Sequence, residues 1–565
     1  MTTLPMNRLA QKNRCRNYGR ISRCLLQIKA VIAEIVADTR GPSHSPVSSV
    51  GFDPARRRAM GAKVTTAERP AASAPVALLA EIQTLARAVA AEGRVTYRTW
   101  RPHLRRPGIA ASMLNFAQYL ALRRRDLRPL QEHLMRYGLS SLGRLEGRVM
   151  VTLEAVEGAL TAAIGAKMSR TRPWPPAERR FIRGQRSLVD HTDSLFGPAP
   201  TGRRTRILVT LPSEAAEDPS FLHNLARHGV DAVRINCAHD GPEAWIAMAR
   251  HTRAASSTHG RDIKVLMDIA GPKLRTGAVR HPEGEKRLKP GDRLLLVRNA
   301  GDLDAPSDIG FRAVCEPPEV LNALSLGKPV ALDDGKLRTI VEALGPSGSV
   351  IVRVEHSPLE GFKLRPEKGL NFPGVELGLP ALSIKDLEDL STIARHADMV
   401  GHSFVQSAAD VSSLQAALAE RQSAGTAPLG IIAKIETIRA VRNLPEIIVE
   451  AAGRQPFGVM IARGDLAVEI GFTRLAEIQE EILWLCEAAS VPVVWATQVL
   501  EEMVKSGLPT RGEMTDAAMS GRAECVMLNK GQNVGAAIDV LDALLRRMAE
   551  HQTKKTYNLR ALHSW

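Results

Sequence analysis

The sequence predicts an α/β protein built around a (β/α)8 barrel, the TIM-barrel architecture. After Thr205, short and nearly all-apolar runs alternate with helical stretches. Such runs are typical of parallel strands buried on both faces, and eight of them, with helices between most, are the number that closes a barrel. The expected strands are 207–211, 231–237, 265–269, 399–405, 431–436, 459–465, 493–498 and 525–529.

A long gap separates the third expected strand from the fourth, and we expect an inserted small β-barrel domain there. Residues 278–372 contain short apolar runs with Gly and Pro between them, such as Arg293–Val297 and Ser349–Val354. The barrel is then expected to occupy residues 205–277 and 373–565. An insertion at the carboxyl ends of the strands could close over the barrel mouth as a lid.

Composition divides the chain before the barrel into three segments. Residues 1–76 are Arg-rich and then rich in Gly, Ser, Pro and Ala, which predicts a basic, flexible N-terminal segment. In residues 77–168 apolar side chains recur at helical spacing, as at Leu78 and Ile82, which predicts an α-helical accessory domain. Residues 169–204 contain several prolines and are expected to be a second linker.

Positive charge is concentrated before residue 200. The first 200 residues hold 33 Lys and Arg against 14 Asp and Glu, whereas the remainder holds 43 against 46. Nucleic acid, an anionic membrane surface or an acidic partner could bind this region. We prefer a solvated, Arg-rich helical surface, because aromatic residues are not interleaved with the arginines in a stacking pattern.

Localisation is predicted from cysteines and apolar runs. No run of 18 apolar residues occurs, so no membrane span is expected. The six cysteines are scattered and no pair has metal-ligand spacing, which is typical of reduced thiols inside the cell. We expect a cytoplasmic protein, with organellar targeting by the Arg-rich residues 1–45 as the alternative.

Charged residues end two of the expected strands. Lys434 and Glu436 end one of them, and Asp465 ends the next. Because parallel barrels keep their chemistry at the carboxyl ends of the strands, these side chains are expected to meet. Two carboxylates beside an ammonium suit a hard cation and a phosphorylated substrate. The alternative is a structural salt bridge of a carboxylate with Lys434 or Arg463.

Ten stretches in residues 205–553 resemble the pyruvate kinase family, in the family's order. They are Ala232–His239, Met267–Gly277, Asp333–Gly335, Lys368–Gly374, Leu379–Asp386, Ser403–Val405, Lys434 with Glu436, Ala462–Asp465, Ala496–Gln498 and Pro509–Arg511. The resemblance implies transfer of a phosphoryl group from phosphoenolpyruvate to ADP, giving pyruvate and ATP, with Mg2+ or Mn2+ as cofactor in a homo-oligomer. Two alternatives stay open: a related barrel enzyme that uses phosphoenolpyruvate or an oxoacid without ADP, and a non-catalytic regulatory protein.

The resemblance also implies roles for single residues. Glu436 and Asp465 match the carboxylates that hold the divalent metal. Lys434 matches the lysine that neutralises charge on the transferred phosphoryl group and the enolate, where an ammonium helps most as charge moves. Arg234 matches the arginine that binds the substrate phosphate, and Thr497 the threonine near the carbon that is protonated.

Other matched positions concern the substrate carboxylate, the nucleotide and the lid. The backbone N–H groups of Gly464 and Asp465 match the carboxylate-binding position. Asp334 matches a lid aspartate, although a turn explains Asp-Asp-Gly equally well. The nucleotide-binding positions are Asn236, His239, Arg275 and Lys368.

The sequence departs from the family at its potassium site. Of the four positions that read Asn, Ser, Asp and Thr in the family, the second and fourth are Ala238 and Ile269, so two oxygen ligands are missing. The Glu that accompanies potassium dependence is Lys273 here, and its ammonium could replace the monovalent cation. We therefore expect activity without potassium.

Three further departures concern loops and regulation. Leu211 stands in the first strand's loop, which has a Gly in the family, and Asn529–Gln532 replaces the family's Ser-Gly-Glu-Thr. The family's C-terminal effector domain has no counterpart in the sequence, so sugar-phosphate allostery is expected to be absent.

Overall fold

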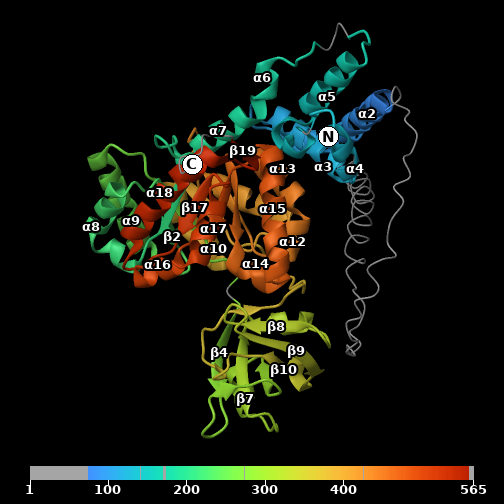
Figure 1. The fold of residues 1–565 in the computed structure, drawn as a ribbon. Coiled ribbons are helices and arrows are strands. Elements are labelled where there is room, and N and C mark those ends of the chain that lie inside the picture. Colours follow the sequence, from blue (N-terminus) through green and yellow to red (C-terminus); the bar gives the residue numbers. More distant parts are fainter. Residues whose placement is uncertain (1–73, 140, 169–172, 273, 424, 559–565) are drawn as a thin grey trace, which may run out of the picture. The chain divides into compact units, whose positions relative to one another are not determined.

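The computed structural model describes residues 74–558 apart from 140, 169–172, 273 and 424 (Figure 1). The expected flexible segment 1–76 therefore lies almost wholly outside the described residues. Within them, eight parallel strands form a closed barrel in the order β1-β17-β16-β15-β14-β13-β3-β2. The strands are β1 (Arg206–Thr210), β2 (Ala232–Asn236), β3 (Lys264–Asp268), β13 (Met399–His402), β14 (Gly430–Ile435), β15 (Phe457–Ala462), β16 (Val493–Ala496) and β17 (Cys525–Leu528).

Every expected barrel strand is present, so the predicted fold class is confirmed. The strand residues are almost all buried, because helices cover the outer face and other strand side chains fill the interior. Figure 1 shows helices on the outside of the barrel strands. They are α8 (Pro219–Arg227), α9 (Pro242–His259), α10 (Ile384–His396), α11 (Ala408–Ala419), α12 (Ile438–Arg442), α13 (Leu444–Ala452), α14 (Arg463–Ile470), α15 (Phe472–Ala489), α16 (Glu501–Ser506), α17 (Arg511–Ser520) and α18 (Val534–His551).

Part of the segment expected to be a linker is helical. It contains α6 (Glu178–Phe181) and α7 (Arg183–Phe196). Leu195 and Phe196, at the end of α7, are buried in one apolar cluster with inward-facing strand residues such as Met399 and Met460. The polar composition of α7 hides this helix from a sequence pattern, because only its last turn enters the barrel.

Two glycines make room for α7 beneath the barrel. A Cβ on Gly430 would lie 2.4 Å from Cδ2 of Leu195, and one on Gly458 would lie 3.2 Å from Cδ1 of the same side chain. Both glycines lie at or near the start of their strands, β14 and β15. The amino-terminal end of the barrel is therefore filled by a side chain from outside the barrel, and the carboxyl end is left for chemistry.

The insertion after β3 forms a seven-stranded sheet in the order β12-β8-β9-β10-β6-β7-β4, with the pair β5 and β11 beside it. The backbone N–H of Thr276 donates to Lys368 O (2.8 Å) and that of Leu370 donates to Leu274 O (2.9 Å), so the first and last strands meet. The strands are β4 (Arg275–Arg280), β5 (Arg287–Leu288), β6 (Arg293–Val297), β7 (Phe311–Glu316), β8 (Pro329–Leu332), β9 (Leu337–Leu344), β10 (Val350–His356), β11 (Phe362–Lys363) and β12 (Leu370–Asn371).

Helices also form the region before the barrel. α2 packs against α3 and α5, and α3 packs against α15 of the barrel. Asn115 of α3 donates to the carbonyl of Ala488 at 2.8 Å. The helices are α2 (Ala74–Trp100), α3 (Ile109–Arg123), α4 (Arg128–Met135) and α5 (Val149–Ala163).

One helix among the described residues, Ala74–His103, is long and apolar enough to cross a membrane by length and composition alone. Core helices pass the same test when they are mostly buried; six residues of this helix, including Ile82 and Val89, are buried, but Val76 and Val95 are exposed and only 28% of the apolar window is buried. The absence of a membrane span therefore stays a prediction.

Candidate active site

Arg234 and Asp268 meet at the carboxyl ends of neighbouring strands. The parallel register places Asn236 of β2 beside Asp268 of β3, so both strands end at the same level. Nε of Arg234 donates to Oδ2 of Asp268 at 2.9 Å, and a terminal nitrogen of Arg234 lies 3.4 Å from Oγ1 of Thr210. One edge of the guanidinium group is thus fixed by a carboxylate, and the remaining N–H groups are available to an anion.

Lys434 of β14 lies at the centre of the cluster. Its ammonium donates to Oγ of Ser403 at 2.9 Å and pairs with Glu436 at 2.9 Å and Asp268 at 3.4 Å. Burial alone would lower the pKa of Lys434, but the two carboxylates outweigh it and raise the pKa. Burial would likewise raise the pKa of Asp268, but Lys434 and Arg234 lower it. Both groups are therefore charged at neutral pH.

Glu436 follows β14 and its side chain is 1% exposed. The backbone N–H of Phe404 donates to Oε2 at 2.6 Å. Burial, opposed by Lys434 and reinforced by the negative charge of Asp465, raises the pKa of Glu436 to about 7. An anion so close to a second carboxylate is unfavourable unless a cation compensates both charges.

The residues present fit a divalent cation held by two carboxylates, Glu436 and Asp465. No group of three or more His, Cys, Asp or Glu side chains with metal-ligand geometry occurs among the residues that the structure describes. Mg2+ is commonly held by one or two carboxylates, with water and substrate oxygens completing its shell. A third carboxylate, Asp334, has its pKa raised by burial and by the charges of Asp465 and Asp333.

Thr497 follows β16 and is held against the start of α14. Its Oγ1 accepts a hydrogen bond from the backbone N–H of Gly464 at 2.9 Å. Nε of Arg463 donates to the carbonyl of Ala496 at 3.0 Å, which ties the same two segments together. The φ of Thr497 is +63°, a left-handed conformation that a β-branched residue rarely adopts and that persists only where the surrounding structure enforces it. The Gly464 N–H expected to bind a substrate carboxylate here donates to Thr497.

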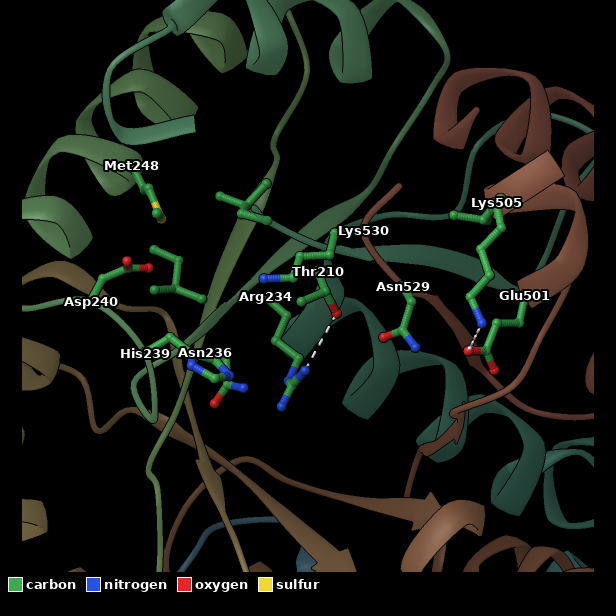
Figure 2. A pocket seen from close by; sticks show the side chains of 13 residues that line it. Thr210, Arg234, Asn236, His239, Asp240, Met248, Glu501, Lys505, Asn529 and Lys530 are labelled. Carbon is green, nitrogen blue, oxygen red and sulfur yellow. Dashed lines mark hydrogen bonds and ion pairs between the residues drawn. The ribbon is translucent and has the colours of Figure 1, made fainter. Parts of the chain in front are cut away.

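A cavity of about 220 Å3 opens on the other side of Arg234 (Figure 2). Three residues expected in the site line it: Arg234, Asn236 and His239. The sequence marked Leu211, Asn529 and Lys530 only as departures from the family, and it did not show that residues of α9 and α16 complete the lining, because folding alone brings these separate segments together. The additional lining residues are Thr210, Leu211, Ile235, Asp240, Met248, Glu501, Val504, Lys505, Asn529 and Lys530.

The remaining expected nucleotide-binding residues lie in the inserted domain. Arg275 pairs with Glu367 at 2.8 Å, and Lys368 pairs with Asp333 at 3.0 Å. Neither lines the cavity, and an isolated β-bridge between Arg275 and Gly369 places them at one point of the inserted sheet. Lys273, the expected substitute for the monovalent cation, lies outside the described residues.

The sequence placed Asp268 only at a retained position of the family's potassium site and assigned Ser403 no role, yet both are central in the cluster. Asp268 holds both Arg234 and Lys434, and Ser403 accepts from Lys434 and donates to the carbonyl of Ile269 at 2.7 Å. Two features of the sequence could have identified them: Asp268 lies at the end of an expected strand, and Ser403 begins the Ser403–Val405 stretch.

Comparison with known proteins identifies the family. A family model described as the barrel domain of pyruvate kinase matches residues 202–536. The chain belongs to the pyruvate kinase family. It is 32% identical to pyruvate kinase 1 of Trypanosoma brucei brucei over 341 residues, covering 60% of this chain and 64% of that protein. It is 30% identical to human pyruvate kinase PKLR over 406 residues, covering 68% and 66%.

A bacterial relative gives the same result. Pyruvate kinase of Methylorubrum extorquens is 34% identical over 339 residues, covering 59% of this chain and 65% of the relative. The chain thus spans somewhat less than two thirds of the length of several pyruvate kinases that it matches. The matched region includes the whole cluster around Lys434 and all eight barrel strands.

Proposed function

We propose that the protein is a pyruvate kinase-type phosphotransferase that transfers a phosphoryl group from phosphoenolpyruvate to ADP. The observation that carries this proposal is the cluster of Arg234, Asp268, Lys434 and Glu436, in a chain of this family. It combines two partly buried cationic side chains, fixed in place by the carboxylates of Asp268 and Glu436, with a further carboxylate at Asp465. Phosphoryl transfer depends mainly on such positioning and charge compensation.

Arg234 and Lys434 act on the charge that moves. The free N–H groups of Arg234 bind phosphate oxygens of phosphoenolpyruvate, and the ammonium of Lys434 lies where the bridging oxygen gains charge as the P–O bond breaks. The phosphoryl group passes to the terminal phosphate oxygen of ADP, and the enolate left behind takes a proton at its terminal carbon to give pyruvate. We propose that this proton arrives from the side of Thr497, whose hydroxyl oxygen accepts a hydrogen bond from the backbone N–H of Gly464.

Glu436 and Asp465 hold the divalent cation, Mg2+ or Mn2+, in this proposal. When bound, the cation supplies positive charge to the phosphate and carbonyl oxygens of the substrates. The two carboxylates fix its position, and the N–H of Phe404 fixes the orientation of Glu436.

We also propose that the reaction requires no potassium. Ala238 and Ile269 offer no side-chain oxygen, and the charge of Asp268 is already compensated by Arg234 and Lys434. Lys273 would add a further cation. We further propose that the protein is cytoplasmic and forms a homo-oligomer. Sedimentation velocity of the purified protein would test the oligomeric state.

The deciding experiment measures pyruvate formation with phosphoenolpyruvate, ADP and Mg2+ in potassium-free buffer. Wild-type turnover that is lost in Lys434→Ala and is unchanged by added potassium supports the proposal. Mg2+-dependent binding of phosphoenolpyruvate without turnover on ADP would instead favour a related barrel enzyme that uses phosphoenolpyruvate differently.

A further inference from the structure

The cavity beside Arg234 is lined by a positively charged side chain, that of Lys530, which has no role in the reaction described above. Lys530 follows β17, the barrel neighbour of β1, and lines the cavity together with Thr210 and Arg234. Figure 2 shows its side chain beside Thr210 and Arg234 at the cavity. It replaces part of a family motif, Ser-Gly-Glu-Thr, in which no residue is basic.

The other lining Lys and Arg side chains have carboxylate partners. Arg234 pairs with Asp268, and Lys505 pairs with Glu501 at 2.7 Å. Asp240 accepts a hydrogen bond from Ser213 at 3.0 Å. For Lys530 no hydrogen bond or ion pair is seen within the described part of the chain. Its positive charge therefore remains available to a ligand in the cavity.

The loop that carries Lys530 is held firmly against α16. A Cβ on Gly531 would lie 2.4 Å from Cγ1 of Val504, so only glycine allows this close approach. The backbone N–H of Asn533 donates to Val504 O at 3.1 Å, and its side chain donates to the carbonyl of Lys505 at 3.1 Å. The backbone of Lys530 is thus fixed, so the loop need not be ordered when its side chain binds an anion, and only the rotamer freedom of that side chain is lost.

We propose that Lys530 binds the diphosphate of the nucleoside diphosphate. This inference rests on the proposed function. Arg234 separates the cavity from Lys434 and Glu436, which lie on β14 and at its end, three strands away from β2. A nucleotide whose terminal phosphate reaches Arg234 from the cavity therefore passes its two phosphates by Lys530. In this chain Leu211 stands where the first-strand loop of the family has a glycine. Beside this altered loop, the ammonium group of Lys530 supplies an additional contact to the diphosphate.

The test is equilibrium binding of ADP in the presence of Mg2+, measured by isothermal titration calorimetry on the full chain. Lys530→Gln is expected to weaken ADP binding about tenfold, the loss typical of one charge-assisted hydrogen bond. The same substitution should weaken the binding of AMP, which lacks the second phosphate, by a smaller factor. The difference in ADP affinity between the variant and the wild type should shrink as the salt concentration is raised. Lys530→Arg keeps the charge and should retain binding.

A matched control separates this contact from a general change in charge. Lys328→Gln removes one exposed lysine from the inserted domain, outside the cavity lining, and should leave ADP binding unchanged. Because Lys530 is exposed, its variants should keep the wild-type circular dichroism spectrum and bind phosphoenolpyruvate as the wild type does.

Two results would overturn the inference, and only one of them would also overturn the proposed kinase function. An ADP dissociation constant for Lys530→Gln within twofold of the wild-type value would overturn it and leave the kinase proposal standing. A wild-type protein that binds phosphoenolpyruvate but not ADP would overturn both.

Discussion

One oxygen atom, Oδ2 of Asp268, holds both cations of the site: Nε of Arg234 lies 2.9 Å from it and Nζ of Lys434 lies 3.4 Å from it. Arg234 comes from β2 and Lys434 from β14, so this carboxylate fixes the spacing of groups from opposite sides of β3 and β13. The distance between the phosphate-binding and charge-neutralising groups therefore depends on a residue that we assign no direct contact with substrate.

Replacing Asp268 with asparagine should lower kcat about a hundredfold, because neither cation keeps its position and both are left with less compensating charge. Steady-state kinetics would measure this, together with the melting temperature, since two partly buried cationic side chains lose their shared partner. The control is Asp262→Asn, which removes an exposed carboxylate that precedes the same strand and pairs with Lys264. It should change kcat and the melting temperature very little. Activity of Asp268→Asn within threefold of wild type would show that Asp268 does not position the two cations.

Binding of Mg2+ should depend on pH through Glu436. Burial, with Asp465 nearby, raises the pKa of Glu436 to about 7 in the metal-free protein, so below that pH a proton must leave before a cation binds. The apparent affinity should rise with pH until about 7 and then level off. Titration calorimetry in buffers of different ionisation enthalpy would detect the released proton. Glu436→Gln should abolish both the proton release and tight binding, and equal affinity at pH 5.5 and 8 would contradict the prediction.

The contact of α7 with the barrel predicts a pair of coupled mutations. Leu195→Ala should lower the free energy of unfolding by about 2–5 kcal/mol, because it leaves a cavity among buried side chains. Gly430→Ala alone should cost about 1–3 kcal/mol, since its Cβ would lie 2.4 Å from Leu195. In the double mutant the second cost should be smaller, because the nearest clashing methyl group is gone and only Cγ of Met399, at 3.0 Å, remains close. Simply additive losses in urea unfolding would show that α7 does not fill this end of the barrel.

Glu487 of α15 should make stability fall as pH rises. Burial, opposed by Lys554 and reinforced by Glu146 and Glu524, raises the pKa of Glu487 to about 7. Because this pKa exceeds that of an unfolded glutamate, the folded state binds the proton more tightly, and stability is lost between about pH 4.5 and 7.

Glu487→Gln should therefore raise the free energy of unfolding by about 1–2 kcal/mol at pH 8 and change it little at pH 4.5. Glu217→Gln, at an exposed position, makes the same change in charge and serves as the control. Glu436 acts in the same direction in metal-free protein, so each variant is compared with wild type at the same pH. A stabilisation that is equal at both pH values would exclude titration of Glu487 as its cause.

The barrel could be predicted because each strand carries its own signal. Strands such as 207–211 and 525–529 are apolar except for Thr210 and Asn529, since both of their faces are covered, and this pattern is local in the sequence. Lys434, Glu436 and Asp465 could be predicted as a group for the same reason, because each ends or follows such a strand.

The remainder depends on contacts between distant segments. The polar sequence of α7 gives no sign that Leu195 enters the barrel, and the paired roles of Asp268 follow from strand register rather than from its neighbours in sequence. The cavity that Lys530 lines combines residues of β1, β2, α9, α16 and the loop after β17, whose proximity exists only in the closed barrel.

The meeting of the first and last strands of the inserted sheet has a consequence for how the chain can be rearranged. The chain leaves the barrel near Leu274 and returns near Leu370, and these two backbones are hydrogen-bonded to each other. Its two ends are therefore no farther apart than adjacent strands, roughly 5 Å. Such a segment is a cassette: it can be excised and its ends joined by a short turn, or exchanged for another domain with adjacent ends, without changing the spacing of the barrel strands on either side.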